Sequence, residues 1–243
     1  MCMTRVVITT NIARNLIGGM RMKKWLRENR GFIVFLLLFG VFRTAIADWN
    51  PIPSGSMRPN LLEGDVVLVN RLAYDLKLPL TDVILAHLGE PRRGDVVTFT
   101  SPADGKRLIK RLVALPGDVV VMRNKQLLIN GVRADYSLLD TGSEPVGDGA
   151  TVPVLHLTER LGGEQRTIQW LPDFARASNF GPVAIPAGQY LMLGDNRDNS
   201  ADSRYIGLIP REVLIGRAER ILVSAAILDN WMPRAQRFGK SLY

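Results

Sequence analysis

Residues 51–60 read PIPSGSMRPN, a stretch in which two serines flank a glycine between prolines. Prolines on both sides disfavour helix and central strand alike, so we expect a loop. Gly55 lets the backbone bend sharply, which allows Ser54 and Ser56 to face one cleft. A serine held in this way can act as a nucleophile, but it needs a base to activate it. An ordinary surface turn rich in Ser, Gly and Pro is the alternative interpretation.

The positive charge of the chain is concentrated near its beginning. The chain has 243 residues, which suits one large domain or two small ones, and a formal net charge of +8. The first 49 residues carry eight basic and two acidic side chains, so they hold six of these eight charges. A nucleic-acid-binding protein would carry the excess on its folded domain. The excess instead flanks an apolar segment, which predicts a lipid bilayer as partner and no nucleic acid.

That apolar segment is residues 31–47, GFIVFLLLFGVFRTAIA. Its length lies at the short end of the membrane-spanning range of about 17–25 residues. Trp25 and Trp49 bracket it as interfacial anchors, and Arg43 can extend its head group to the far interface. The residues before it, 1–30, are basic, so the positive-inside rule places them in the cytoplasm. We therefore expect one transmembrane helix at 31–47, with everything after Trp49 outside.

A cleavable signal peptide is the competing interpretation of the same segment. A basic start, an apolar run and the triplet Ala45-Ile46-Ala47 would suit it, and self-cleavage near Ala47 stays open. Residues 1–21 show no clear pattern, and Met22 would make a natural start, so the true first residue, Met1 or Met22, also stays open. With a start at Met22 the single cysteine, Cys2, would be absent. Either way we expect no disulfide, no cysteine metal site and no cofactor in the exported part.

Beyond the membrane segment the pattern is mostly that of β-structure. The sequence Gly-Asp-Val-Val occurs at 64–67, 94–97 and 117–120, in each case a turn followed by a β-branched run, which predicts a strand start. Residues 119–122 and 126–129 predict a hairpin.

The second half of the chain alternates less regularly. We interpret 134–186 as the less regular part of an inserted subdomain, whereas 189–193 and 220–228 are strand-like and should rejoin the first sheet. The predicted fold is mainly β. It has an antiparallel main domain formed by 48–118 and 187–243, which carries the candidate serine, and a smaller inserted β subdomain at 119–186.

Two histidines could provide the base. His87 lies in a helical-looking stretch, 81–88, and His156 alternates with apolar residues in the inserted region. Neither has a Gly-, Ser- or Asp-rich setting, so a Ser-His-Asp triad is possible but unsupported.

Lys110 is the stronger candidate for the base. In a strand, Leu108, Lys110, Leu112 and Ala114 share one face, and a lysine on an apolar face calls for an explanation. Burial penalises the charged amine and can lower its pKa by up to about 3–5 units, so that it can accept a proton from a serine. The alternative is that Lys110 extends to solvent beside Arg111.

Residues 194–204, GDNRDNSADSR, form a third polar stretch. A calcium loop starting at Asp198 would need Gly at its sixth position and Glu at its twelfth, where Ser203 and Ile209 stand. The many acids and bases between apolar runs predict an internal cross-linked loop, although a surface turn is possible.

Together these segments closely resemble bacterial type I signal peptidase (leader peptidase), the Ser/Lys-dyad membrane protease that removes signal peptides. The resemblance covers the membrane anchor and residues 52–61, 94–102, 110–118 and 194–210. It implies that Ser56 is the nucleophile and Lys110 the general base, that the Ser54 hydroxyl and the Ser56 amide form the oxyanion hole, and that Ser200 orients Lys110.

The resemblance also implies two groups of supporting residues. Four match the family's structural salt-bridging positions: Asp195, Arg197, Asp202 and Arg204. Five fall where the family lines its pockets for small residues: Ile52, Pro53, Met57, Leu61 and Ile109. The chain departs from the family pattern in having Asn60 where threonine is common, a short cysteine-free inserted subdomain, and one membrane segment where some members have two.

The implied function is a membrane-bound serine endopeptidase that cleaves signal peptides from exported preproteins after small residues, Ala-x-Ala. We expect a monomer in the bacterial cytoplasmic (inner) membrane, single-pass, with its catalytic domain on the periplasmic face. A soluble self-cleaving Ser/Lys repressor protease with a DNA-binding domain is the alternative of the same fold. A non-enzymatic exported β protein is the alternative of a different class, and it would tolerate exchange of Ser56 and Lys110.

Overall fold

The structure is a computed structural model that describes residues 25–79, 81, 83–146, 150–174 and 178–243. It comprises two compact units, Met1–Thr44 and Ala45–Tyr243. The predictions for Cys2, for a start at Met22 and for the basic residues before Trp25 lie outside the described residues.

The described part of the N-terminal unit is helical. Residues 25–28 are helical, and α2 covers Arg30–Ala45. Large apolar side chains of α2 are exposed, among them Phe32 (62%) and Leu38 (66%). The Thr44 hydroxyl donates to the Gly40 carbonyl at 2.8 Å, which gives this polar group a partner within the helix. The helix ends two residues before the predicted boundary at 47. Among the described residues, no helix is both long and apolar enough to cross a membrane.

The second unit is built on a seven-stranded sheet with the order β1-β2-β16-β5-β6-β14-β15, in which every strand pair is antiparallel. Its strands are β1 (Ala47–Pro51), β2 (Asp65–Asn70), β5 (Val96–Thr100), β6 (Arg107–Ala114), β14 (Gln189–Leu193), β15 (Ile209–Pro210) and β16 (Leu214–Ser224). Segments from both ends of the chain therefore form one sheet, as predicted for a mainly β antiparallel fold. The strand predicted at 220–228 begins earlier, at Leu214, and ends at Ser224.

The chain between β6 and β14 forms two further sheets. One has the order β13-β7-β8-β9, with strands β7 (Val119–Arg123), β8 (Gln126–Ile129), β9 (Val132–Arg133) and β13 (Phe180–Ala184). The predicted β7–β8 hairpin is confirmed, and Asn124 and Lys125 have φ angles of 48° and 67°, as its tight turn requires. The other sheet contains β10 (Asp135–Val146), β11 (Ala150–Leu161) and β12 (Glu164–Trp170).

The prediction of weak regularity after residue 134 is wrong, because β10 and β11 each contain 12 residues. Polar side chains explain why the alternation looked weak. Glu159, Arg166 and Gln169 are all buried on β11 and β12, where an ordinary strand would place apolar residues.

A small two-stranded sheet pairs β3 (Asp75–Lys77) with β4 (Ile84–His87). The helix expected around His87 is therefore wrong. The backbone of residues 84–87 instead pairs with β3, so tertiary pairing prevails over the helical appearance of this short apolar run.

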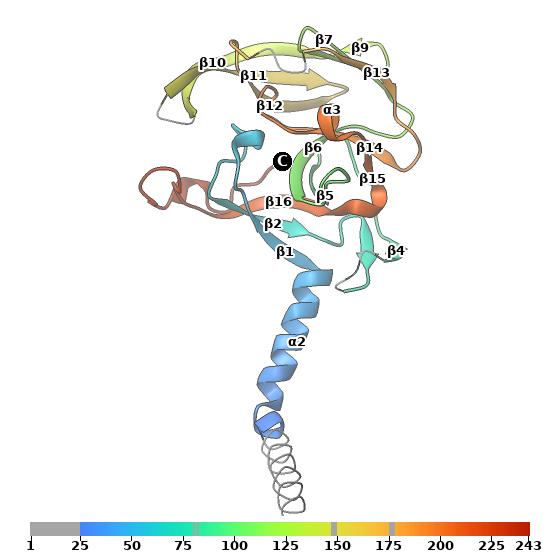
Figure 1. The fold of residues 1–243 in the computed structure, drawn as a ribbon, viewed down its shortest axis with the longest axis vertical. Coiled ribbons are helices and arrows are strands. Elements are labelled where there is room, and N and C mark those ends of the chain that lie inside the picture. Colours follow the sequence, from blue (N-terminus) through green and yellow to red (C-terminus); the bar gives the residue numbers. More distant parts are fainter. Residues whose placement is uncertain (1–24, 80, 82, 147–149, 175–177) are drawn as a thin grey trace, which may run out of the picture. The chain divides into compact units, whose positions relative to one another are not determined.

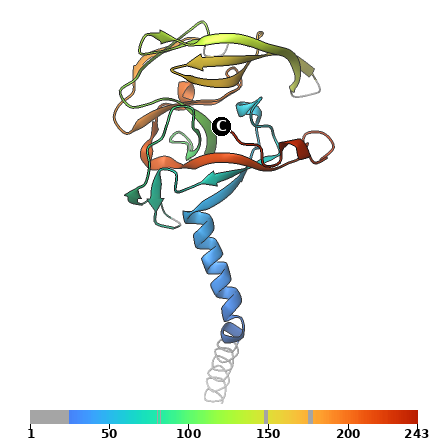
Figure 2. The ribbon, with the colours of Figure 1, turned by 180° about the vertical axis from the view of Figure 1, so that it is seen from behind.

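Three hydrophobic clusters form the core of the second unit. One packs Ile52, Met57 and Leu61 against side chains of β2, β5 and β16. Another joins Val113 and Leu191 of the large sheet to the β7–β8 hairpin. Figures 1 and 2 show β10–β12 and β7 on one side of β6 and β14, with β16 and β2 on the other. A short helix, α3 (Ser203–Ile206), follows β14.

Candidate active site

The loop between β1 and β2 carries Ser56. A single 3-10 turn, Gly55–Met57, forms its centre. Met57 and Leu61 are fully buried and fasten the loop to the core below. At its base the Ile52 amide donates to Asp65 O at 2.8 Å, and the Gly64 amide donates to Ile52 O at 3.0 Å. Gly64 has φ +87°, and a Cβ there would lie 2.1 Å from Ala225 O, so glycine is required at this position.

Lys110 lies on β6, where it pairs with Val97 of β5. Its side chain is 3% exposed, and its Nζ donates to Ser56 Oγ at 2.5 Å. Burial lowers the pKa of Lys110 to about 8, because the charged amine has lost its water. Asp202 and Asp195 oppose this change, and Arg204 reinforces it. The alternative interpretation, in which Lys110 extends to solvent, is therefore wrong.

A second lysine shows that burial alone does not identify a base. Lys77 is 6% exposed, but its Nζ donates to the carbonyl oxygens of Glu212 and Leu214 at 2.6 and 2.8 Å. Carbonyl acceptors favour the protonated amine, whereas the hydroxyl of Ser56 can itself give up a proton to Lys110. The hydrogen-bond partner of a buried lysine therefore distinguishes a structural lysine, such as Lys77, from a candidate base, such as Lys110.

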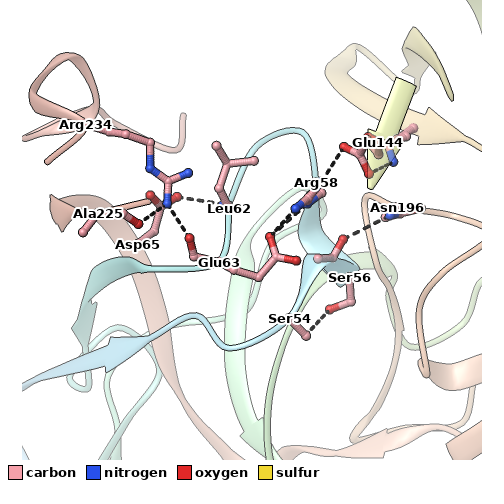
Figure 3. Close-up of polar contacts among 12 residues, drawn as sticks. Ser54, Ser56, Arg58, Leu62, Glu63, Asp65, Glu144, Asn196, Ala225 and Arg234 are labelled. Atoms are coloured by element: carbon pink, nitrogen blue, oxygen red, sulfur yellow. Dashed lines mark hydrogen bonds and ion pairs between the residues drawn. The ribbon is translucent and has the colours of Figure 1, made fainter. Parts of the chain in front are cut away.

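The other two serines lie close to Ser56. The Ser54 hydroxyl is 3.5 Å from Ser56 Oγ. A dashed line marks this contact in Figure 3. Ser200 is 9% exposed, and its Oγ makes no hydrogen bond to any described residue, so a direct bond to Lys110 is absent here. Gly194 lies between Ser200 and the loop that carries Ser56. A Cβ on it would lie 2.2 Å from Ser200 Oγ and 2.5 Å from Ser56 O.

The loop at 194–204 is internal and held by ion pairs. Asp195 accepts two hydrogen bonds from Arg111, at 2.8 and 2.7 Å. Arg204 pairs with Asp202 at 2.8 Å, and Asp202 also accepts from the Gly194 amide at 3.0 Å. These pairs keep both carboxylates engaged near Lys110.

The fourth predicted salt-bridging residue has a partner on a strand between β6 and β14. Arg197 pairs with Glu159 of β11, which also binds Arg166 of β12. Sequence reasoning did not identify Arg111 or Glu159 as partners. Arg111 adjoins Lys110 in the sequence, but nothing in the local pattern marks Glu159.

A cavity of about 240 Å³ adjoins the serine and the lysine. Three of the five predicted pocket residues, Ile52, Pro53 and Ile109, line it. The other two, Met57 and Leu61, lie in the core below the loop and not in the wall of the cavity. Sequence reasoning missed the remaining lining residues: Asn50, Pro51, Thr98, Arg107 and Leu108.

Neither histidine makes a hydrogen bond to Ser56. His87 Nδ1 lies 2.7 Å from Asp75 Oδ1, and His156 Nδ1 lies 2.5 Å from Asp140 Oδ1. His156 Nε2 contacts the Gln169 side chain at 3.2 Å. In the described part of the chain, no group of three or more His, Cys, Asp or Glu side chains is arranged to hold a metal ion.

A buried serine hydroxyl bonded to a buried lysine amine, beside a cavity, is the arrangement of a serine hydrolase with a lysine base. The family model described as "Signal peptidase, peptidase S26" matches residues 22–223. The chain belongs to this signal peptidase family, and it is accordingly a serine peptidase that cleaves signal peptides.

Two relatives compared by sequence agree with this assignment. The chain is 39% identical to signal peptidase I of Pseudomonas fluorescens and 37% identical to that of Pseudomonas aeruginosa, in each case over 80% of this chain and 71% of the relative. It is similar to the crystal structure of a signal peptidase I from Enterococcus faecalis, with 30% identity over 53% of this chain and 96% of that one, and a TM-score of 0.32.

Proposed function

We propose that the chain is a membrane-bound endopeptidase in which Ser56 is the nucleophile and Lys110 the general base, acting on signal peptides of exported preproteins after small residues. The contact of 2.5 Å between Lys110 Nζ and Ser56 Oγ carries this proposal. It supports proton transfer because the donor and acceptor are already within hydrogen-bonding distance. The lowered pKa of Lys110, about 8, leaves a useful fraction of the amine neutral near neutral pH.

In the acylation step, neutral Lys110 takes the hydroxyl proton while Ser56 Oγ attacks the scissile carbonyl carbon. The carbonyl becomes a tetrahedral oxyanion. The C–N bond then breaks, the Lys110 ammonium gives its proton to the leaving amine, and an ester on Ser56 remains. In the second half, Lys110 takes a proton from water as the water attacks this ester. The proton returns to Ser56 Oγ when the acid product leaves.

The oxyanion needs hydrogen-bond donors, and the loop offers two. We assign this role to the Ser56 amide and the Ser54 hydroxyl, which lies 3.5 Å from Ser56 Oγ. We assign Ser200 the role of orienting Lys110. Its buried hydroxyl adjoins the same loop through Gly194, and a hydroxyl can aim an amine without stabilising the ammonium as a carboxylate would.

The cavity beside the dyad accounts for a preference for small residues. Its volume is about 240 Å³, and apolar side chains of Ile52 and Ile109 contribute to its wall. An alanine side chain fits such a space, whereas a large side chain would clash with the wall. This supports cleavage after Ala-x-Ala.

We propose the segment 31–47 as the single membrane anchor, with its N-terminal side in the cytoplasm and the catalytic domain on the periplasmic face. The exposed Phe32, Leu37 and Leu38 side chains of α2 support this location, because a surface of this kind needs apolar surroundings. Protease added to spheroplasts should then digest the part after Trp49, and full protection of that part would contradict this topology.

The inserted β subdomain is proposed at 119–186, between the two parts of the catalytic domain, 48–118 and 187–243. Its support is that no strand between β6 and β14 belongs to the seven-stranded sheet in the described residues.

The decisive experiment incubates the purified full chain with a preprotein, alongside Ser56→Ala, Lys110→Ala and the control Lys106→Ala. Lys106 is a largely exposed lysine paired with Asp104. We expect the first two variants to lose at least about a thousand-fold in kcat while remaining folded, and the control to match the wild type. Processing by Ser56→Ala at the wild-type rate would remove the proposed nucleophile. It would favour the non-enzymatic alternative for this site.

A further inference from the structure

The loop between β1 and β2, residues 52–64, is called the nucleophile loop because it carries Ser56. Arg58, two residues after Ser56, forms one ion pair within this loop and one with a residue outside it. Its Nε donates to Glu63 Oε2 at 2.9 Å, and Glu63 belongs to the same loop. Its Nη1 lies 3.0 Å from Oε1 of Glu144 on β10. A dashed line marks this ion pair in Figure 3. The side chains of Arg58 and Glu144 are only 14% and 18% exposed. Solvent therefore screens this pair less than a fully exposed one.

Glu144 is also fixed by a hydrogen bond from the neighbouring strand β12. Its Oε2 accepts a hydrogen bond of 2.9 Å from Nε2 of Gln169, a residue of β12 that is 0% exposed. The Gln169 amide donates to Asp195 O at 2.9 Å, and its carbonyl accepts from the Arg197 amide at 3.0 Å. The carboxylate of Glu144 thus has a defined position relative to the loop at 194–204.

The nucleophile loop has other anchors, but they fix different atoms. Asn196 donates from its amide to Ser56 O and from its side chain to Gly55 O, each at 3.1 Å. Asn60 Nδ2 donates to Thr167 O of β12 at 2.7 Å. The pair between Arg58 and Glu63 lies inside the loop and cannot fix it to anything else. Glu144 is therefore the group that holds Arg58 to the neighbouring sheet.

We propose that Glu144 is a positioning residue for the reaction: by binding Arg58 it holds the nucleophile loop so that Ser56 Oγ stays against Lys110 Nζ. This rests on the proposed roles of Ser56 and Lys110. In this proposal strands β10 and β12 contribute to the reaction, because they carry Glu144 and Gln169 and support the nucleophile loop. The charges that shift the pKa of Lys110 are those of Asp202, Asp195 and Arg204. Glu144 therefore acts through position, and its loss leaves the pH dependence of the reaction in place.

The test compares Glu144→Gln with Glu164→Gln in cleavage of a preprotein by the full chain in detergent. Glutamine keeps the shape of the side chain and removes its charge. Glu164 is an exposed glutamate on β12 and serves as the matched control. We expect Glu144→Gln to lower kcat by roughly ten- to hundred-fold, because small misplacements of a reacting group have effects of this size. The KM and the midpoint of the pH–rate profile of Glu144→Gln should stay unchanged. The control, Glu164→Gln, should keep the wild-type kcat.

A double-mutant cycle separates positioning from a general structural effect. Arg58→Met and Glu144→Met should each lower kcat, and the double variant should lose no more than the more severe single variant, since both remove the contact between Arg58 and Glu144. Losses that multiply, an unchanged kcat in Glu144→Gln, or a change confined to KM would overturn the proposal. If either Met variant unfolds, the isosteric Glu144→Gln decides alone.

Ser56→Ala in the same assay distinguishes the proposed function from the positioning role of Glu144. If Ser56→Ala is active, the proposed function fails. If it is inactive while Glu144→Gln is unaffected, only the positioning role fails.

Discussion

Lys110 Nζ lies 2.5 Å from Ser56 Oγ, although the two residues are separated by 54 positions in the chain. The two nearby carboxylates, Asp195 and Asp202, are bound by Arg111 and Arg204 and make no hydrogen bond to this amine. Lys110 is thus buried without a carboxylate partner of its own. This combination lowers its pKa, since a direct ion pair would favour the ammonium.

The activity should rise with pH as Lys110 loses its proton. Only the neutral amine accepts the Ser56 proton, and the pKa of Lys110 is lowered to about 8. We therefore expect kcat/KM to increase tenfold per pH unit at acidic pH and to level off above about pH 8. The measurement is a pH–rate profile on one preprotein substrate. A profile that rises only near the ordinary lysine value of 10.5 would contradict a desolvated base.

Replacing the lysine by an apolar side chain should abolish activity and stabilise the fold. Below pH 8 Lys110 is protonated in the folded and the unfolded chain, so the folded protein bears the full cost of the buried charge. Lys110→Met removes this cost, and we expect a free energy of unfolding higher by up to about 3 kcal/mol at pH 7.

The stability difference between Lys110→Met and the wild type should also depend on pH, and the direction of this dependence tests the prediction. Between pH 8 and 10.5 the unfolded wild type binds more protons than the folded one, so wild-type stability rises with pH and the advantage of Lys110→Met disappears. Denaturation in detergent at several pH values measures this, with Lys106→Met as the control that should change little. A variant less stable than the wild type at pH 7 would be inconsistent with a costly buried charge.

The two members of the ion pair between Arg204 and Asp202 should shift the pKa of Lys110 in opposite directions. Arg204 lowers the pKa of Lys110, whereas Asp202 raises it. Arg204→Gln should therefore move the pH–rate midpoint up, and Asp202→Asn should move it down, each by up to about one unit. Midpoints that shift in the same direction would show that these variants act through the fold and not through their charge.

Gly194 should tolerate no side chain. An alanine Cβ would lie 2.2 Å from Ser200 Oγ and 2.5 Å from Ser56 O, so both the loop and Ser200 would have to move. We expect Gly194→Ala to cost roughly 1–3 kcal/mol of stability, and to lower kcat by about 100-fold. Gly142→Ala is the matched control, because its nearest neighbour would be Val154 Cγ2 at 3.5 Å. Wild-type kcat in Gly194→Ala would show that this close approach does not matter for the reaction.

The sequence by itself determined the features that depend on near neighbours in the chain. The three Gly-Asp-Val-Val segments begin β2, β5 and β7, because a glycine with positive φ followed by β-branched residues starts a strand locally. The hairpin at Asn124 and Lys125 has the same local origin. The candidate dyad was predicted through the resemblance of its motifs to the family, because the local patterns around Ser56 and Lys110, each taken alone, also suit a surface turn and a lysine that extends to solvent.

Only the tertiary structure decided which polar groups meet. Glu159, Arg166 and Gln169 made β11 and β12 look irregular in sequence, because each is buried beside a partner. Glu159 pairs with Arg166 and with Arg197, and the Gln169 side chain donates to Glu144. The same holds for Met57 and Leu61, which pack into the core and not into the cavity wall. Burial of a polar side chain is stable when a partner satisfies it. Here the partners arrive from segments brought close by strand pairing, and local sequence carries no record of that pairing.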